Sequence, residues 1–398
     1  MNFTPVTTIG LDLAKNIFQV HGANAQGRQV FNKPIKRDKL AEFFQLQPPC
    51  VVAMEACSSA HHWARLIRSM GHDVRLIAPQ HAKRYVQGNK HDASDASAIC
   101  EAVTRPRMRF VAIKTIEQQA ERSLHCARQA FVKERTAAAN RIRGLLAEYG
   151  LIIPQGISHI TNRVPELIED ASNALPGRFR VLVDSLIEHF KFLHDKIAAL
   201  EKQIKSACTA PVVRQLQTIP GIGPISASAL VAGIGDVSVF KNGRELAAWL
   251  GLVPAQHSSG GKTHMKGISK RGDSYLRHLL VHGARSVICA TQKKHKRKGS
   301  GVMQGEAALC TPNQPSTVLA AGQDLGSMQA RGTVDQGGGM GVPALPQKQT
   351  WLEGLLERKH INVATVALAA RNARIVWAVL KTGRNYEPGY VDARFAKA

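Results

Sequence analysis

Four acidic residues lie at positions in the sequence where a negative charge calls for a functional explanation. Asp12 lies between two leucines inside an apolar run, where an unpaired charge is costly. Glu55 directly follows a second apolar run. Asp92 and Asp95 are three residues apart, so on a helix they share one face. If the two runs form neighbouring strands and the helix packs at their edge, the four carboxylates meet.

Such a cluster requires a cation, because like charges repel one another. Carboxylate oxygens are hard ligands that suit Mg²⁺ or Mn²⁺. We therefore expect Mg²⁺, with Mn²⁺ as the alternative, and take the four acids as metal ligands and catalytic residues. A pair of such ions can hold the attacking and the leaving oxygen of a phosphoryl displacement. The simpler interpretation applies to single acids, since Asp92 could merely cap its helix.

A serine-containing segment is the second candidate for chemistry. Residues 254–262, with the sequence PAQHSSGGK, predict a polar loop that contains glycine. A serine in this loop could attack phosphorus if metal ions or arginines stabilise its alkoxide. His257 could act as a base, although a lone histidine in a polar loop is more often solvated. By itself, such a loop is usually only a flexible connection.

The charge of the chain points to a polyanionic partner. Among 398 residues, 53 are Lys or Arg and 29 are Asp or Glu, which gives a net charge of +24. This surplus costs free energy through self-repulsion unless a polyanion shares it, so nucleic acid is the leading partner. The segment 262–298 carries eleven Lys or Arg residues and one Asp, and its candidate phosphate contacts are Lys270, Arg271 and Arg277. The alternatives are a merely solvated basic face and a basic housekeeping protein.

A glycine motif offers a second type of phosphate contact. Residues 219–226, IPGIGPIS, predict a tight turn that leads into a helix, as in a helix-hairpin-helix motif. Gly221 and Gly223 allow backbone N–H groups to approach a phosphate, and the helix start adds a favourable dipole. The alternative is a plain turn between two helices.

The N-terminal part of the chain alternates extended and helical patterns. We expect strands at 8–13, 17–21, 29–35, 51–54 and 73–77. Helices are expected at 39–46 and 62–70 and over most of 79–104. This order predicts a mixed sheet with helices on its faces.

Long helical patterns follow at 115–149 and 163–206. In the second, apolar residues repeat at a heptad-like spacing: Leu193, Ile197, Leu200 and Ile204. A coiled-coil spacer or dimer arm accounts for these patterns, and an intramolecular helical hairpin does so equally well. Residues 351–381 again predict strong helix.

The chain is therefore expected to be an α/β plus α protein with five segments. They are a catalytic α/β domain (1–114), a helical spacer (115–208), a mostly helical C-terminal domain with the glycine motif and serine loop (209–298), a Gly/Pro-rich insert expected to be disordered (299–349), and the C-terminal helices of that domain (350–383).

Several classes of protein are excluded by the composition. There is no apolar run of about 18 residues or more, so no transmembrane helix is expected. No basic segment followed by an apolar one marks a signal peptide. The seven cysteines include no CxxC pair, which argues against a disulfide framework or a zinc knuckle. We expect a reducing cytoplasm and no membrane partner.

Eight short segments of the chain match one known family: IGLDLAK (9–15), MEACSSAHHWAR (54–65), RLIAPQ (75–80), NKHDASDA (89–96), ICEAVTRP (99–106), IPGIG (219–223), AWLGLVP (248–254) and ISKRG (268–272). Taken together, these segments resemble the DEDD-type insertion-sequence transposases of the IS one-ten family, in its IS eleven-eleven subgroup. The likeness runs from about residue 7 to 295 and resumes at 351–381. The family normally has only a short connection where this chain has residues 299–349.

The resemblance implies an N-terminal RuvC-like domain of the ribonuclease-H type. The family's DEDD tetrad falls on Asp12, Glu55, Asp92 and Asp95, and binds Mg²⁺. The serine of the family's Ser-Gly pair falls on Ser259, with Ser258 as the neighbouring alternative. In this family the serine is the nucleophile that forms a covalent phosphoserine link to a DNA end.

The resemblance also implies partners. Members are recombinases guided by a structured noncoding RNA from the end of the element, which pairs with target and donor DNA. They assemble as dimers and tetramers, so that the serine of one subunit complements the acids of another. The expected location is the cytoplasm, in association with the bacterial nucleoid.

Three other functions compete with this interpretation. A junction nuclease would use the same acids with water as the nucleophile, and the serine would be dispensable. A non-enzymatic descendant of a transposase would bind nucleic acid without cutting it. A sugar-kinase or actin-like ATPase also begins with a strand carrying Gly-x-Asp, but the other phosphate-binding loops are missing and the charge does not fit.

Overall fold

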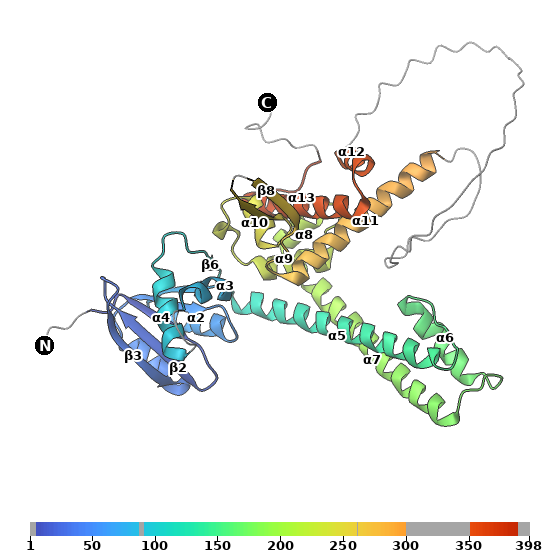
Figure 1. The fold of residues 1–398 in the computed structure, drawn as a ribbon, viewed down its shortest axis with the longest axis horizontal. Coiled ribbons are helices and arrows are strands. Elements are labelled where there is room, and N and C mark those ends of the chain that lie inside the picture. Colours follow the sequence, from blue (N-terminus) through green and yellow to red (C-terminus); the bar gives the residue numbers. More distant parts are fainter. Residues whose placement is uncertain (1–4, 87–90, 261, 300–350, 389–398) are drawn as a thin grey trace, which may run out of the picture.

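The computed structural model describes residues 5–86, 91–260, 262–299 and 351–388. An α/β unit, a helical arm and a mostly helical C-terminal unit follow one another along the chain (Figure 1). Apart from Gly299, which ends α11 (Ser274–Gly299), the segment 299–349 that we expect to be disordered lies within the undescribed range 300–350. That expectation therefore lies outside the described residues.

The N-terminal unit is built on a mixed six-stranded sheet. Its strands are β1 (Thr8–Asp12), β2 (Ile17–Ala23), β3 (Gln29–Lys36), β4 (Val51–Glu55), β5 (Asp73–Ile77) and β6 (Phe110–Val111). Their order is β3-β2-β1-β4-β5-β6, with β1, β4 and β5 parallel and the other pairs antiparallel. The five expected strands are confirmed, and the sheet is consistent with a ribonuclease-H-like fold.

Helices cover both faces of this sheet. They are α1 (Leu40–Gln45), α2 (Ala60–Ser69), α3 (Pro79–Ala82) and α4 (Asp92–Val103), with short 3₁₀ turns at Arg37–Lys39 and Lys83–Tyr85. Strand residues alternate between the two faces. Ile9, Leu11, Val52 and Met54 pack against α1 and α2, whereas Ala53 packs against α4 on the other face.

The helical arm consists of α5 (Ile116–Ala147), α6 (Ile157–Glu169) and α7 (Gly177–Ala207). α5 and α7 pack along each other within one chain, around buried Ile142, Ile187 and Phe190 (Figure 1). The intramolecular hairpin is therefore the arrangement seen in one chain. The helical pattern over 163–206 is divided between α6 and α7, and in the connection between them Asp170 accepts hydrogen bonds from Ser172.

The C-terminal unit holds most of the remaining helices around one core. Its elements are α8 (Pro211–Gln217), α9 (Pro224–Ile234), a 3₁₀ turn (Val237–Val239), α10 (Gly243–Trp249), β7 (Pro254–Ser259), β8 (Lys262–Ile268), α11 (Ser274–Gly299), α12 (Trp351–Arg358) and α13 (Ile361–Thr382). Two expectations are corrected here. Residues 254–268 form a β-hairpin rather than a loop, and the helix over 351–381 is interrupted before His360, which caps α13.

α13 is the one helix in the described part of the chain that is long and apolar enough to cross a membrane. Its apolar residues Leu368, Ala369 and Val376 belong to the core that α8–α11 share. Asn372 is buried in its middle and donates a hydrogen bond to the Pro220 carbonyl. The packing therefore identifies α13 as a core helix of this unit.

The start of α5 is held by the sheet unit on one side and the C-terminal unit on the other. Arg65 of α2 donates hydrogen bonds to the Lys114 carbonyl (2.7 Å) and to Gln119 (3.0 Å). One turn further along, Arg122 forms a 2.7 Å ion pair with Asp273, which precedes α11. α5 is thus the element through which the two units are connected.

A buried histidine completes this junction. His125 of α5 is fully buried and lies 3.1 Å from the Tyr275 hydroxyl of α11 and 3.0 Å from the Ser228 hydroxyl of α9. Burial, together with nearby arginines, lowers the pKa of His125 to about 4, so the ring is neutral near pH 7. Its two ring nitrogens therefore tie three helices together without a buried charge.

The packing of α4 on β1 depends on a residue without a side chain. A Cβ at Gly10 would lie 2.2 Å from the Ala96 carbonyl oxygen and 2.6 Å from the Cys100 amide nitrogen. Only glycine therefore lets the α4 backbone lie directly on the strand that carries Asp12.

We predict that Gly10→Ala pushes α4 off the sheet and lowers the free energy of unfolding by about 1–3 kcal/mol. The matched control is Gly144→Ala on exposed α5 surface, where a Cβ meets nothing within 4 Å. That variant should be unchanged or more stable by up to about 1 kcal/mol. Chemical denaturation measures both, and equal effects would contradict the role given to Gly10.

Candidate active site

Asp12 and Glu55 end two adjacent parallel strands. The β1–β4 register pairs Leu11 with Met54, so the two acids are the next residue on each strand. Neighbouring strands are about 4.8 Å apart. Since side chains alternate along a strand, both acids project from the face that Gly10 and Ala53 present to α4. The sheet therefore brings the first two candidate acids side by side beneath this helix.

α4 brings the other two acids to the same edge from its first turn. Asp92 is its first residue and Asp95 lies one turn on. The helix is capped by His91, whose Nδ1 accepts a hydrogen bond from the Ser94 amide at 3.1 Å. Asp92 is therefore not the capping residue, and the capping alternative does not explain its position.

A polar relay across the sheet holds the start of α4 in place. Gln19 pairs with Asp12 in the β1–β2 ladder. Its side-chain amide donates a 2.6 Å hydrogen bond to Asn32 Oδ1, and Asn32 Nδ2 donates a 3.1 Å bond to the Ala93 carbonyl. The first turn of α4 is thus tied to the strands beside Asp12. Nothing in the sequence pattern marks Gln19 or Asn32 for this role.

The electrostatics of Asp12 show that the four acids influence one another. Its pKa is raised from 3.8 to about 6, first by burial and then by the charges of Asp95, Asp92 and Glu55. A backbone hydrogen bond at Leu13 opposes the shift. The other three acids are therefore near enough to Asp12 to disfavour its charge, and their common role as a metal site stays a prediction.

The donor set at this edge has the chemistry that a hard divalent cation requires. Four carboxylates supply oxygen ligands, and a cation would relieve the repulsion that raises the pKa of Asp12. Among the described residues, no group of three or more His, Cys, Asp or Glu side chains already has the arrangement of a metal site. The type of donor thus fits Mg²⁺ or Mn²⁺. To bind such an ion, the four carboxylates must move closer to one another.

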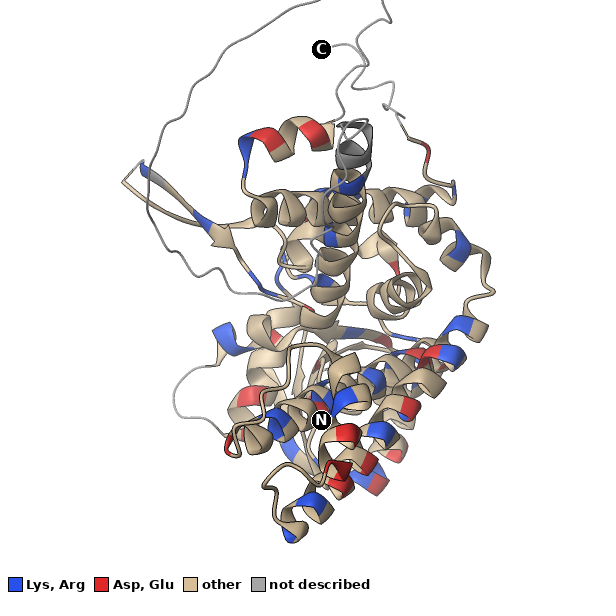
Figure 2. Ribbon diagram, turned by 90° about the vertical axis from the view of Figure 1, so that its right-hand side faces the viewer, with Lys and Arg blue, Asp and Glu red and all other residues tan. Residues whose placement is uncertain are grey.

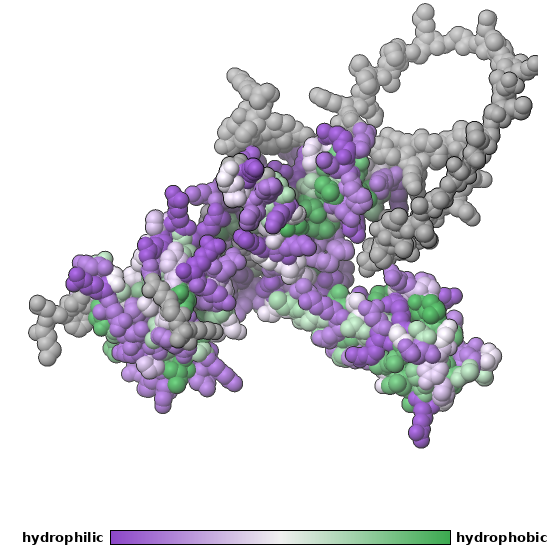
Figure 3. All heavy atoms as spheres, in the orientation of Figure 1, coloured by the Kyte–Doolittle hydropathy of each residue, from purple (hydrophilic) through white to green (hydrophobic). Residues whose placement is uncertain are grey.

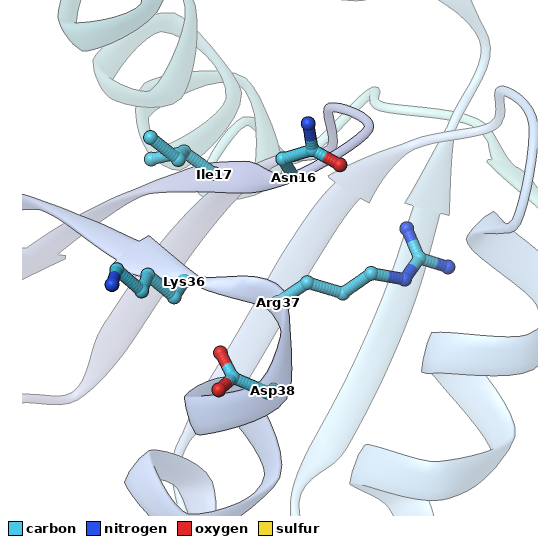
Figure 4. Close-up of a pocket in the computed structure, with 5 residues that line it drawn as sticks. All are labelled: Asn16, Ile17, Lys36, Arg37 and Asp38. Carbon is cyan, nitrogen blue, oxygen red and sulfur yellow. The ribbon is translucent and has the colours of Figure 1, made fainter.

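A pocket of about 460 Å³ lies at the same edge of the sheet, where β2 begins and β3 ends. It is lined by the five residues drawn in Figure 4: Asn16, Ile17, Lys36, Arg37 and Asp38. The Arg37 guanidinium lies over the rings of Phe18 and Trp63 and donates a 3.2 Å hydrogen bond to the Lys15 carbonyl. Sequence reasoning missed this fixed cation, because it depends on long-range packing.

The candidate serines lie near the tip of the β7–β8 hairpin. Ser259 pairs with Lys262 in the β7–β8 ladder, and Gly260 has a left-handed φ of +55°. Ser258 accepts a 2.8 Å hydrogen bond from the side-chain amide of Gln256. Both serines are exposed.

Within one chain, the hairpin is separate from the sheet edge that carries Asp12, Glu55, Asp92 and Asp95, which we call the acidic edge. It belongs to the C-terminal unit and projects from the body of the molecule, whereas the sheet lies in the N-terminal unit (Figures 1 and 2). The structure therefore brings Asp12, Glu55, Asp92 and Asp95 together but does not bring Ser259 to them.

The two glycines of the predicted phosphate-binding turn have different surroundings. Gly221 has a φ of +86°, and a Cβ there would lie 2.6 Å from the Gly283 carbonyl oxygen of α11. Helix packing thus accounts for glycine at this position. Gly223 is exposed and open at the start of α9, before Pro224. Their contacts with phosphate stay predictions.

The three candidate basic residues also differ. Lys270 and Arg271 are exposed in the loop before α11. Arg277 lies on α11, and its guanidinium donates hydrogen bonds to the carbonyls of Leu250 (3.0 Å) and Arg271 (3.2 Å). Arg277 therefore holds this loop in place, which the sequence pattern did not indicate.

The raised pKa of Asp12 makes stability depend on pH with a defined sign. The folded state holds the Asp12 proton more tightly than the unfolded state, so stability is lost as the pH rises from about 4 through 6. Without divalent metal, Asp12→Asn should therefore be more stable than the wild type at pH 8 by about 1–2 kcal/mol. This range allows for solvent screening of the partly exposed Asp12 side chain. The difference should shrink toward pH 4.

Denaturation in chelator at both pH values measures this effect. Asp184→Asn, at an exposed position on α7, is the matched control and should show no such pH dependence. An equal response of the two variants would contradict the repulsion at the acidic edge.

Comparison with known proteins agrees with this geometry. Residues 9–151 match a DEDD transposase domain of the IS110 type, and residues 213–299 match the family described as Transposase IS116/IS110/IS902 family. A "Probable family 20 transposase" of Pseudomonas aeruginosa is 43% identical over 387 residues, covering 96% of this chain and 99% of that protein. The transposase for insertion sequence element IS1111A of Coxiella burnetii is 35% identical, covering 96% and 92%.

The transposase for element IS1328 of Yersinia enterocolitica is 36% identical, covering 95% of this chain and 98% of that protein. The DEDD domain shared with this group implies dependence on a divalent metal ion. The chain belongs to the IS110/IS116/IS902 family of insertion-sequence transposases, enzymes that bind, cut and rejoin DNA.

Proposed function

We propose that this transposase recombines DNA through a covalent serine intermediate, assisted by divalent metal at the four acids and guided by a noncoding RNA. The observation that carries the proposal is the convergence of Asp12, Glu55, Asp92 and Asp95 at one edge of the sheet, recorded in the raised pKa of Asp12. These acids would hold Mg²⁺ or Mn²⁺, which supplies positive charge to the phosphate under attack.

Ser259 is the nucleophile in this proposal. Its Oγ forms a bond to phosphorus, and the bond from phosphorus to a deoxyribose oxygen breaks. The serine proton passes to His257, two residues earlier on β7, and the leaving oxygen takes up a proton. One phosphate ester replaces another, so the reverse reaction rejoins DNA without ATP.

The position of the hairpin supports a site shared between subunits. Because Ser259 is exposed on a projecting hairpin, it is available to the acidic edge of another copy. The arm offers a surface for such an assembly, since Figure 3 shows hydrophobic side chains exposed on it. Exposed apolar residues of the arm include Tyr149, Ile152, Val181, Leu182 and Phe192. They support the proposed homodimer or tetramer.

An RNA guide is consistent with the types of contact that the chain offers. Lys270, Arg271 and Gly223 are exposed and would contact phosphates in this proposal, and such contacts do not read bases. Lys36 and Arg37 add two cations at a pocket where β2 begins and β3 ends (Figure 4). Pairing with RNA would then supply sequence recognition, and the enzyme would act at the nucleoid in the cytoplasm.

The second candidate function is a metal-dependent nuclease that uses water. It is favoured by one observation, namely that the four acids converge without Ser259 in a single chain. In that case Ser259 is dispensable for cutting. An inactive, nucleic-acid-binding relative would retain binding without any cutting.

A covalent adduct distinguishes these functions. The full-length protein is incubated with Mg²⁺, the DNA of its element ends and RNA transcribed from the flanking end, and products are resolved on denaturing gels. We expect a protein–DNA adduct with wild type and Ser258→Ala, and a loss of at least about a hundredfold with Ser259→Ala or Asp12→Ala. Cut DNA without an adduct, unaffected by Ser259→Ala, would establish the water-using nuclease instead.

The basic loop before α11 provides a separate test of nucleic-acid binding. Arg271→Ala should weaken binding to all DNA sequences alike and lower the salt dependence by about one unit of slope. The matched variant Arg277→Ala should instead lower the free energy of unfolding by about 1–2 kcal/mol, because two carbonyls lose their donor. Binding titrations at several salt concentrations measure the slope, and a changed sequence preference in Arg271→Ala would contradict a phosphate contact.

A further inference from the structure

The two faces of the β7–β8 hairpin carry different chemistry. Residues directly opposite each other in the ladder share a face, and neighbours along a strand alternate. The register pairs Ser259 with Lys262 and His257 with His264, so these four residues lie on one face. The other face carries Ser258, whose hydroxyl is engaged by Gln256.

This arrangement separates the two candidate serines. Ser258 shares its face with Gln256 and with Met265, an exposed apolar residue. Ser259 faces a cation and two imidazoles, the groups that can stabilise charge on a phosphate or accept a proton. The hairpin therefore presents a reactive face and an inert one.

Lys262 is the cation closest to Ser259 along this face. Residues directly opposite each other have Cβ atoms about 4.5–5.5 Å apart, within reach of a flexible ammonium. The register of the β7–β8 ladder places Lys262 directly opposite Ser259. Lys262 is exposed and has no carboxylate partner among the described residues, so its charge is available to a ligand.

The charge of the hairpin matches the partner that it would meet. Residues 254–268 contain two lysines and no Asp or Glu. A DNA phosphate at the four acids is negative, and so are the acids themselves. A positive hairpin tip is attracted to this site, whereas a neutral tip would gain nothing from the field.

We propose that Lys262 is a catalytic residue that binds the phosphate attacked by Ser259. This inference rests on the proposed function, since it assigns the partner of the same nucleophile. The ammonium contacts a non-bridging phosphate oxygen on which negative charge grows as the Ser259 Oγ–phosphorus bond forms. No proton leaves Lys262, so its contribution is electrostatic.

The test compares rates of adduct formation at saturating protein, with the full-length enzyme, its RNA and DNA ends, and Mg²⁺. Lys262→Met removes the charge and keeps a long side chain, and Lys262→Arg keeps the charge. Lys266→Met is the matched control, because it removes a lysine four residues farther along β8. We expect Lys262→Met to slow the reaction by about tenfold or more, with Lys262→Arg recovering most of the rate.

DNA affinity and thermal unfolding of the same variants separate catalysis from binding and folding. Lys262→Met should match Lys266→Met in both measurements. Equal reaction rates for these two variants, with a wild-type adduct that Ser259→Ala abolishes, would overturn the role of Lys262 alone. Absence of a wild-type adduct would overturn the serine mechanism together with it.

Discussion

The direct packing of α4 on β1 is the contact on which the acidic site depends. Gly10 lets the helix backbone touch the strand, and the first turn of α4 then carries Asp92 and Asp95 to the strand ends that bear Asp12 and Glu55. Holding four carboxylates at one edge costs electrostatic free energy. The pKa of Asp12 is raised because the charges of the other three acids add to the effect of burial. Apolar packing on both faces of the sheet offsets this cost, and a divalent cation removes it.

The second constraint is the separation of the acids from the serine hairpin. Each lies in its own unit, and α5 connects the two units through Arg65, the Arg122–Asp273 ion pair and buried His125. Within one chain the hairpin projects from the C-terminal unit, whereas the acids lie in the N-terminal unit (Figures 1 and 2). A firmly held α5 makes large rearrangement inside one chain costly, which favours a second copy as the source of the serine in our proposal. The exposed apolar surface of the arm provides a place where copies can meet (Figure 3).

Local patterns predicted the sheet well because its strands are short apolar runs between clear turns. An aspartate inside such a run also pointed to Asp12, which is half-buried and influenced by the charges of three other acids. The hairpin at 254–268 was missed because its strands are polar, so no alternation of apolar and polar residues marks them. The tertiary roles of Gly221, Arg277 and Asn32 were also missed, because each contact joins residues distant in the sequence or in different elements.

The most direct test of this account is to identify the residue that carries DNA after the reaction. The products formed with Mg²⁺ are digested with nuclease and protease, and mass spectrometry locates the remaining nucleotide. We expect a nucleotide on the peptide that contains Ser259, at Ser259 and not Ser258, and none when Mg²⁺ is replaced by chelator. A nucleotide on Ser258 or on any other residue, or cut DNA with no modified peptide, would contradict it.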